Sequence, residues 1–413
     1  MVDYMYFVNF KVFKYTLDLW KEVKRFEYPT DAVLSKFFRD NRKINKNDKN
    51  IIAETIYTIL RNYYKLHKVT QSDELLILCA WINLMKVSTD DIAEIFSRTY
   101  HEYLDLDKLD YDVIELPEWV IEKLLKVMSL DEIKALDKEM SAQARLTLRT
   151  NTLKINRKDL IAELKQQNII ATETKYSPWG VVIKEKASLM NNDLFASGCF
   201  EVQDESSQLA GLFFDAKRSE MITDFCAGSG GKTLVFGMTM KNTGRIYSFD
   251  VNERRLNNMK PRLSKSGLSN IYPQLITSEK DSKLKRLAEK MDRVFVDAPC
   301  LGFGTIRRNP DLKFRQSINS LAEINEKQIS ILSSAAKLVK SGGVLAYATC
   351  SILPEENQNI VQQFLENNPD YKIIELNELA KGIGLELKDN NYLELFPHIH
   401  GTDGFFCCLM KKD

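Results

Sequence analysis

The sequence predicts an α/β protein whose C-terminal half holds a doubly wound, mostly parallel sheet, preceded by a small α+β module and an all-α region. From residue 206 onward, short apolar runs rich in β-branched and aromatic residues alternate with helical stretches, as expected of such a sheet. Before residue 140, apolar residues instead recur at helical spacing. A chain of 413 residues with 44% hydrophobic residues is long enough for two or three domains with cores of their own.

The first predicted domain, residues 1–140, is helical throughout. Apolar pairs recur at helical spacing over 51–64 and 75–82. Its two prolines, Pro29 and Pro117, stand near segment edges, where a helix can begin. The pattern at 51–64 is preceded by a basic run: Arg39, Arg42, Lys43, Lys46 and Lys49. This run is either a solvated loop or a surface that contacts phosphates.

The second and third predicted domains are residues 141–205 and 206–413. In the second, residues 146–149 and 180–183 read as strands and 157–167 as a helix, which makes a small α+β module. In the third, strands are expected near 221–225, 245–250, 271–276, 293–297 and 343–349, with two further strands near 371–376 and 405–410.

Composition excludes several classes of protein. A net charge of +1 does not indicate a nucleic-acid binder, although a local basic face remains open. The seven cysteines are scattered and form no CxxC pair, which argues against a disulfide framework and a zinc site. His398 and His400 have no partners at ligand spacing, so we assign no metal. Lys11 and Lys14 interrupt the apolar N-terminus, so we expect no signal peptide, no membrane span and a cytoplasmic location.

Two predicted strands end in reactive residues. The run 294–300 closes with Asp297 and Cys300, and the run 345–350 closes with Cys350. Because parallel strands present their carboxyl ends at one edge of a sheet, these three side chains should meet there. The alternative is that both cysteines are small core residues, which is the commonest fate of a free cysteine.

A glycine-rich loop, Cys226–Thr233, follows the strand at 221–225. A phosphate-binding P-loop would need glycine at position 226, and a dinucleotide fingerprint would need glycine at position 233; neither is present. Asp250 ends the second strand, where an acid can accept two ribose hydroxyls. Together these features suit a nucleoside without a pyrophosphate, of which S-adenosylmethionine is a common example.

These residues resemble the RNA cytosine-5 methyltransferases of the Fmu/Sun and NOL/NOP/Sun group. The loop Cys226–Thr233 is similar to their CAAPGGKT, residues 297–300 to DAPC, and residues 302–311 to GxGxxRRxPD. Residues 347–357 resemble YxTCS and PEEN, and residues 401–406 match GxDGFF. Upstream, residues 202–207 resemble VQDxSSQ, residues 148–151 LRxN, and residues 48–61 a helix of the NusB-like domain.

The resemblance covers nearly the whole chain and implies a fold. It implies an all-α NusB-like, RNA-binding domain over 1–140 and a small RRM-like module over 141–205. The domain over 206–413 would be a Rossmann-like methyltransferase domain, with a mostly parallel sheet and an antiparallel last strand. We expect a monomer.

The resemblance also implies roles for individual residues. Cys350 would attack carbon 6 of cytosine, and Cys300 would aid release of the product. Asp297, held protonated, would donate to N3, and Lys232 would lie beside the base, where an ammonium favours a thiolate. The implied S-adenosylmethionine-binding residues are Cys226, Ala227, Gly228, Ser229, Gly230, Gly231, Lys232, Asp250, Arg255 and Asp297. For Arg255, a solvated helix position is the alternative.

Other polar residues near these motifs have less defined roles. A cluster after the DAPC segment suits RNA phosphates: Arg307, Arg308, Lys313 and Arg315. Glu355 and Glu356 follow Pro354 in a first helical turn, which suits acids for structural reasons.

The chain departs from the family pattern at three places. Gly228-Ser229 replaces Ala-Pro, which should loosen the turn but keep its amides, and Leu301 replaces a serine. The third strand lacks its usual terminal acid. Glu279 or Asp281 would substitute if the loop is shifted; otherwise binding there depends on Thr277 or Ser278.

The predicted function is S-adenosylmethionine-dependent methylation of cytosine carbon 5 in RNA, with 16S rRNA as the expected substrate. One alternative is a tRNA cytosine-5 methyltransferase. Another is a non-catalytic RNA-binding protein that keeps the methyltransferase fold as a scaffold. The presence of both thiols, Asp297 and Lys232 argues against the scaffold.

Overall fold

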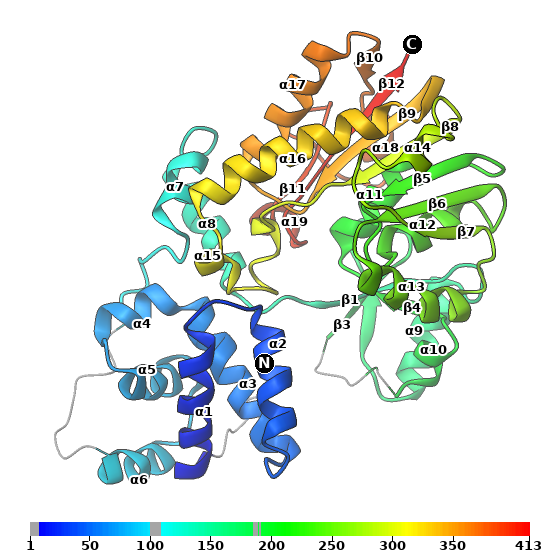
Figure 1. Cartoon of the computed structure of the whole chain (residues 1–413). Helices are drawn as coiled ribbons and strands as arrows, with labels where there is room; N and C mark the ends of the chain where they lie inside the picture. The colour runs from blue at the N-terminus through cyan, green and yellow to red at the C-terminus, as the bar shows by residue number, and fades with distance from the viewer. Residues whose placement is uncertain (1–7, 100–108, 185–188, 190) are drawn as a thin grey trace. The chain divides into compact units, whose positions relative to one another are not determined.

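The computed structural model describes residues 8–99, 109–184, 189 and 191–413. The chain forms two compact units (Figure 1). Unit 1 comprises residues 1–143 and 306–317, and unit 2 comprises residues 144–305 and 318–413. The segment 306–317, which we predicted to be part of the C-terminal domain, therefore belongs to the N-terminal unit.

Unit 1 is built from helices, as the apolar spacing predicts. Pro29 and Pro117 stand directly before two of them, and a capping box begins another. The apolar faces of the first six helices enclose a core around Trp20 and Trp81. The helices are α1 (Phe10–Val23), α2 (Thr30–Asp40), α3 (Lys46–Arg61), α4 (Tyr63–Val69), α5 (Asp73–Ala80) with the π-helical turn η1 (Trp81–Met85), α6 (Thr89–Thr99), α7 (Glu118–Leu124), α8 (Leu130–Met140) and α15 (Leu312–Arg315).

Unit 2 begins with the small α+β module. Its four strands form an antiparallel sheet in the order β2-β3-β1-β4. They are β1 (Leu146–Thr150), β2 (Ala171–Glu173), β3 (Gly180–Ile183) and β4 (Phe200–Val202), with helices α9 (Arg157–Gln166) and α10 (Asp193–Ala196). Strands β2 and β4 were not predicted, because a run of three residues seldom shows a strand period.

The rest of unit 2 forms the predicted α/β domain. The sheet order is β10-β12-β9-β8-β5-β6-β7, with β11 paired to β12. Strands β7, β6, β5, β8 and β9 are parallel to one another, β12 pairs antiparallel with β9, and β10 pairs antiparallel with β12. The strands are β5 (Met221–Phe225), β6 (Arg245–Asp250), β7 (Ile271–Leu275), β8 (Met291–Asp297), β9 (Val339–Thr349), β10 (Tyr371–Ile373), β11 (Leu393–Leu395) and β12 (Phe405–Lys412). The predicted fold class is confirmed, and the short β11 is an addition.

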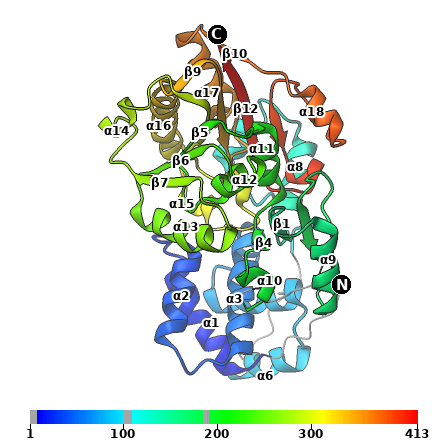
Figure 2. The same ribbon diagram turned by 90° about the vertical axis from the view of Figure 1, so that its right-hand side faces the viewer.

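Helices cover both faces of this sheet, and side chains alternate between them. Phe295 of β8 packs with Phe214 and Phe236 on the face of α11, α12 and α13. Its neighbours Val294 and Val296 point to the other face, under α16 and α17 (Figures 1 and 2). The helices are α11 (Glu205–Phe214), α12 (Gly231–Thr239), α13 (Glu253–Ser266), α14 (Ser282–Lys285), α16 (Ile318–Ala336), α17 (Gln358–Asn367), α18 (Asn377–Gly382) and α19 (Pro397–His400), with short 3₁₀ turns η2 (Phe303–Thr305) and η3 (Pro354–Glu356).

The strand order fixes where a ligand can bind. From β5 the chain continues outward to β6 and β7, then returns to place β8 on the other side of β5. The carboxyl ends of β5 and β8 therefore form a topological switch point, where open α/β sheets bind their ligands. The glycine-rich loop follows β5, and Asp297 ends β8.

Candidate active site

The glycine-rich loop turns sharply between β5 and α12. Cys226, Gly228 and Gly230 all have positive φ, at 67°, 56° and 81°. At Gly230 a side chain is also excluded sterically, because an added Cβ would lie 2.6 Å from the Met259 side chain. Burial raises the pKa of the Cys226 thiol well above its ordinary value, so this third cysteine is not a ready nucleophile.

Asp250, at the end of β6, holds this loop in place. Its Oδ2 accepts the Gly228 amide at 2.7 Å, and its Oδ1 accepts the Asn252 amide at 2.7 Å. The side chain is buried, yet it lines the cavity at the switch point. Each carboxylate oxygen can accept a further hydrogen bond, which keeps Asp250 suited to a ligand hydroxyl.

A second carboxylate, Asp224, lies beneath the loop. The Thr233 hydroxyl donates to its Oδ2, and the side chain is fully buried. Burial raises the pKa of Asp224 to about 7. Asp224 thus ties β5 to the first turn of α12, next to Lys232.

The third-strand loop shows which polar groups face the cavity. Glu279, Thr277 and Ser278 line it, whereas Asp281 is not among the lining residues. Asp281 instead accepts from the Thr277 amide and hydroxyl, at 2.8 and 3.0 Å. Glu279 accepts from Lys327 and Ser330, at 2.6 and 2.7 Å. Of the two acids proposed as substitutes, only Glu279 is on the cavity wall, and its carboxylate is already paired.

The two predicted cysteines lie side by side. Cys300 Sγ is 3.3 Å from Cys350 Sγ, and both residues line the cavity. The contact with Cys350, together with burial, raises the pKa of the Cys300 thiol well above its ordinary value. Cys300 is therefore protonated near neutral pH and can donate its S–H toward Cys350.

Lys232 and Asp297 form an ion pair beside the thiols. Lys232 Nζ donates to Asp297 Oδ2 at 2.8 Å and lies 5.1 Å from the centre of the Phe405 ring. Burial is the largest influence on Lys232 and would lower its pKa, but the nearby acidic groups, Asp297 foremost, together outweigh burial and raise it. A Cys350 thiolate would add to this rise, so the ammonium and that thiolate attract each other. The role of Asp297 as a proton donor stays a prediction, and the structure adds Lys232 as the group that donates to its carboxyl.

Glu356 supports both cysteine segments from below. It is fully buried, and its Oε1 accepts the Leu301 amide at 2.8 Å and Gln328 Nε2 at 3.1 Å. Its Oε2 accepts the Ser351 hydroxyl. Burial raises the pKa of Glu356. The structural role that we predicted for Glu356 thus includes contacts next to Cys300 and Cys350.

Two glycines allow the cysteine segments to approach closely. The Gly304 amide donates to the Cys350 carbonyl at 2.9 Å, and the Gly404 amide donates to the Gly304 carbonyl at 2.8 Å. An added Cβ on Gly304 would lie 2.1 Å from the Gly404 carbonyl oxygen. Only glycine fits at this backbone crossing.

The cavity has a volume of about 490 Å³ and brings together seven of the predicted site residues: Cys226, Gly228, Asp250, Arg255, Asp297, Cys300 and Cys350. The other predicted residues do not line it, and these are Ala227, Ser229, Gly230, Gly231 and Lys232. Lys232 adjoins it through Asp297. Sequence reasoning missed Lys327, which also lines the cavity. No local pattern marks that lysine, because α16 carries several exposed polar residues.

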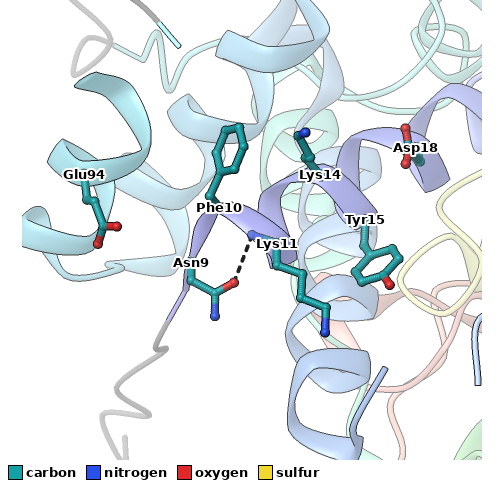
Figure 3. Close-up of a pocket in the computed structure, with 7 residues that line it drawn as sticks. All are labelled: Asn9, Phe10, Lys11, Lys14, Tyr15, Asp18 and Glu94. Carbon is teal, nitrogen blue, oxygen red and sulfur yellow. Dashed lines mark hydrogen bonds between the residues drawn. The ribbon is translucent and has the colours of Figure 1, made fainter. Parts of the chain in front are cut away.

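Unit 1 has hollows of its own. One lies along α1, where Lys14 Nζ is 4.9 Å from the Phe10 ring centre and Lys11 Nζ is 5.9 Å from that of Tyr15 (Figure 3). The Lys11 amide donates to Asn9 at 3.0 Å. Among the described residues that line this hollow, Asp18 and Glu94 carry the carboxylates and none is a cysteine.

Three residues of the basic cluster expected to contact RNA phosphates are buried or paired with carboxylates. Lys313 Nζ donates to Glu115 Oε2 at 2.8 Å, and both side chains are 1% exposed. Arg315 donates to Asp311 at 3.4 Å, and Arg307 is buried. The phosphate-binding prediction is therefore wrong for Lys313. In the separate basic run over residues 39–49, Arg42, Lys43 and Lys46 are exposed, so the phosphate contact predicted there stays a prediction.

The described residues contain no group of three or more His, Cys, Asp or Glu side chains that could hold a metal ion. Among the helices described, none combines the length and the apolar character needed to cross a membrane.

Comparison with known proteins places the chain in a family. Residues 212–411 match the sequence model of the 16S rRNA methyltransferase RsmB/F family, and residues 116–190 match that of the RsmF/B-like ferredoxin-like domain. Probable ribosomal RNA small subunit methyltransferase B of Bacillus subtilis is 31% identical over 72% of this chain and 66% of its own length. The protein of the same description from Synechocystis is 31% identical over 75% of this chain and 70% of its own length.

More distant relatives extend these similarities. The human 28S rRNA (cytosine(4447)-C(5))-methyltransferase is 29% identical over 76% of this chain, but this chain spans only 40% of that protein. The crystal structure of PH0851 has a TM-score of 0.81 and 25% identity, and covers 98% of this chain and 99% of its own. NSun6 from Pyrococcus horikoshii, solved with SFG, shares the fold, with a TM-score of 0.63 and 21% identity over 72% of this chain and 99% of its own. The chain belongs to the RsmB/F family of 16S rRNA methyltransferases.

Proposed function

We propose that this protein transfers a methyl group from S-adenosylmethionine to carbon 5 of a cytosine in RNA, through a covalent bond between Cys350 and carbon 6 of the base. One observation carries the proposal. The thiols of Cys300 and Cys350 lie 3.3 Å apart, facing the same cavity as Asp297. A methyltransferase that acts on an exocyclic amine needs no thiol, whereas carbon 5 of cytosine is too poor a nucleophile to react without one.

The cavity suits a nucleoside with a charged tail. Its apolar wall includes Phe225, Val251 and Ile276, which can contact a purine ring. Asp250 adds a carboxylate for ribose hydroxyls, and Thr277 and Ser278 add hydroxyls where the family usually has an acid. When bound, S-adenosylmethionine supplies an electrophilic methyl group on a sulfonium. We assign its ribose to Asp250.

Covalent activation of the base begins with Cys350. Its thiolate attacks carbon 6, and the new C–S bond breaks the aromaticity of the ring and makes carbon 5 nucleophilic. Lys232 attracts that thiolate, and the Cys300 thiol can donate to it at 3.3 Å. The attraction by Lys232 and the hydrogen bond from Cys300 favour Cys350 as the attacking group and Cys300 as its protonated neighbour.

Addition at carbon 6 is assisted by a proton on N3. The Lys232–Asp297 pair holds such a proton, because Lys232 Nζ donates to Asp297 Oδ2 at 2.8 Å. We assign the protonation of N3 to this pair, with Asp297 as the group that faces the cavity.

Release of the product needs Cys300. After carbon 5 has been methylated, it must lose its proton so that the C–S bond to Cys350 can break. As the C5 proton leaves, its bonding electrons form the C5–C6 double bond and the sulfur departs as a thiolate. Cys300 lies beside that sulfur, and in the same step it gives its own proton to the departing thiolate and accepts the proton from carbon 5, while the proton on N3 returns to the Lys232–Asp297 pair.

The substrate assignment comes from the family. The Bacillus and Synechocystis relatives are described as acting on small-subunit ribosomal RNA, and the human relative is described as acting on carbon 5 of a cytosine in 28S rRNA. We therefore propose 16S rRNA as the substrate, with tRNA as the alternative.

The test is to map 5-methylcytosine in rRNA and tRNA from cells with and without the gene, and to repeat the reaction with purified protein. We expect one or more 5-methylcytosines in 16S rRNA to depend on the gene. Loss of 5-methylcytosine from tRNA alone would show that tRNA, and not 16S rRNA, is the substrate. Folded protein that binds RNA but methylates neither would contradict the enzymatic function.

A further inference from the structure

The segment 306–317, which we call the strap, connects the cysteine site to the helical unit. It follows directly after η2, next to the Cys300 segment, but packs within unit 1. It then returns to unit 2 at Ile318, where α16 begins. Both ends of the strap therefore continue into elements of the candidate active site.

Within unit 1 the strap is held by a buried ion pair. Lys313 Nζ donates to Glu115 Oε2 at 2.8 Å, with both side chains 1% exposed. Glu115 also accepts the amides of Tyr64 and Lys65 at the start of α4, at 3.1 and 2.9 Å. A buried carboxylate with three donors is well satisfied and holds its partners in fixed positions.

Aromatic packing holds the next residue of the strap. The Phe314 ring stacks on Phe26, with centroids 4.4 Å apart, and meets Tyr63 edge-on at 5.0 Å. On the other side, Asp311 accepts the amide of Thr30, at the first turn of α2, at 3.2 Å. Residues from three different regions of unit 1 therefore contact this short segment.

Within unit 2 the ends of the strap continue into the supports of the thiols. Just before it, the Gly304 amide donates to the Cys350 carbonyl at 2.9 Å, and the Leu301 amide donates to Glu356. After it, α16 carries Gln328, whose amide group donates to the Pro299 carbonyl at 3.0 Å and to Glu356 at 3.1 Å. A displacement at either end would act on the segment that holds Cys300.

We propose that Lys313 and Phe314 are positioning residues, through which the helical unit fixes the Cys300 segment against Cys350. They touch neither the base nor the cofactor. Their effect on the reaction would pass through residues 301–305 and α16. Unit 1 thus contributes to the chemical step as well as to any RNA contact. This inference rests on the proposed function, because it assumes that the two thiols react with a base.

The kinetic test compares Phe314→Ala with a control in the same unit. Ile95→Ala removes a buried side chain on α6, which lies at the end of unit 1 far from α15 (Figures 1 and 2). A misplacement of about 1 Å costs roughly 10- to 100-fold in rate, so Phe314→Ala should lower kcat by that factor. The KM for RNA and the Kd for S-adenosylmethionine should stay close to those of the wild type. Phe314→Tyr, which keeps the ring, should restore kcat.

A second measurement does not depend on methylation. A short bifunctional thiol reagent such as dibromobimane should bridge Cys300 and Cys350 in the wild-type chain, and Cys300→Ala should abolish that product. Phe314→Ala and Lys313→Met should bridge more slowly, whereas Ile95→Ala should match the wild type. Each comparison is made below the onset of thermal unfolding of the variant.

The outcomes separate the two proposals. If Phe314→Ala keeps wild-type kcat and bridging, or if Ile95→Ala impairs both equally, the strap is only part of the fold and the inference is wrong. If the wild type bridges but does not methylate RNA, the proposed function fails. In that case slower bridging in the strap variants alone would still support positioning.

Discussion

Two lysine–carboxylate pairs with the same 2.8 Å contact lie in different surroundings. Lys313 and Glu115, in unit 1, are each 1% exposed. Lys232 and Asp297, in unit 2, are 11% and 32% exposed, and Asp297 opens on the cavity. Burial outweighs Glu115 and lowers the pKa of Lys313, whereas at Lys232 the nearby acidic groups, Asp297 foremost, together outweigh burial and raise the pKa.

The comparison shows that geometry alone does not distinguish a structural ion pair from a chemical one. The Lys313–Glu115 pair is shielded from solvent, and its hydrogen-bond partners lie inside unit 1. In the Lys232–Asp297 pair, Asp297 lies on the cavity wall, and the Cys350 thiol is nearby. Removing a charge should therefore impair folding in the first case and the reaction in the second.

The largest effect on the reaction is expected from removing the lysine of the Lys232–Asp297 pair. Lys232→Met should lower methyl transfer by about 10²- to 10⁴-fold, the usual contribution of a general acid–base group. Thermal unfolding should change little, because Asp297 keeps access to water. A single-turnover methylation assay with a parallel unfolding curve tests this. If Lys232→Met unfolds easily but stays active when folded, the pair is structural after all.

The buried pair should respond in the opposite way. Glu115→Gln leaves the Lys313 ammonium buried without its counter-charge, which typically costs about 3–5 kcal/mol of unfolding free energy. The double variant Lys313→Met, Glu115→Gln removes both charges and should recover most of that loss. Denaturant unfolding of the three proteins measures the difference. Equal stability of the single variant and the wild type would contradict the burial argument.

Asp224 predicts how stability depends on pH. Its folded pKa, about 7, lies above the ordinary value of 3.8, so the folded state binds the proton more tightly. Its contribution is complete below pH 4 and is lost as pH rises toward 7, by at most about 4 kcal/mol. Between pH 4 and 8, the free energy of unfolding should therefore fall less steeply with pH for Asp224→Asn than for the wild type. A steeper fall in the variant would reverse the sign.

Asp250 should show a smaller effect, confined to the cofactor. Asp250→Ala removes acceptors that would bind ribose hydroxyls, at about 1.5–3 kcal/mol for each charge-assisted hydrogen bond. It also frees the amides of Gly228 and Asn252. Calorimetry with S-adenosylmethionine should show weaker binding, with RNA affinity as the control. Unchanged cofactor affinity would remove Asp250 from the site.

The fold class was predictable because its signals are local. Each long strand of the main sheet shows as an apolar run, and Asp297, Cys300 and Cys350 stand at strand ends, where topology brings them together. The three-residue strands β2, β4 and β11 were missed, because such short runs seldom reveal a period, although β10, of the same length, was predicted. The family motifs supplied the rest of the site by resemblance.

The roles of Lys313 and Asp297 could not be predicted from local sequence. Lys313 looks like a surface cation beside a catalytic motif, but its partner Glu115 is 198 positions away in the chain. Asp297 was expected to carry its own proton, but Lys232, 65 positions away, donates to it. In both cases the partner lies far away in the chain, and no local pattern records it.

The central claim is that Cys350 forms the covalent bond and Cys300 aids its breakage. The most direct measurement incubates each alanine variant with RNA and S-adenosylmethionine and looks for protein linked to RNA on a denaturing gel. Cys350→Ala should give no adduct and no methylation, with cofactor binding intact. Cys300→Ala should accumulate the adduct, because elimination needs the C5 proton removed while addition does not. A stable adduct with Cys350→Ala and none with Cys300→Ala would reverse the assignment, and normal methylation by both variants would contradict the mechanism.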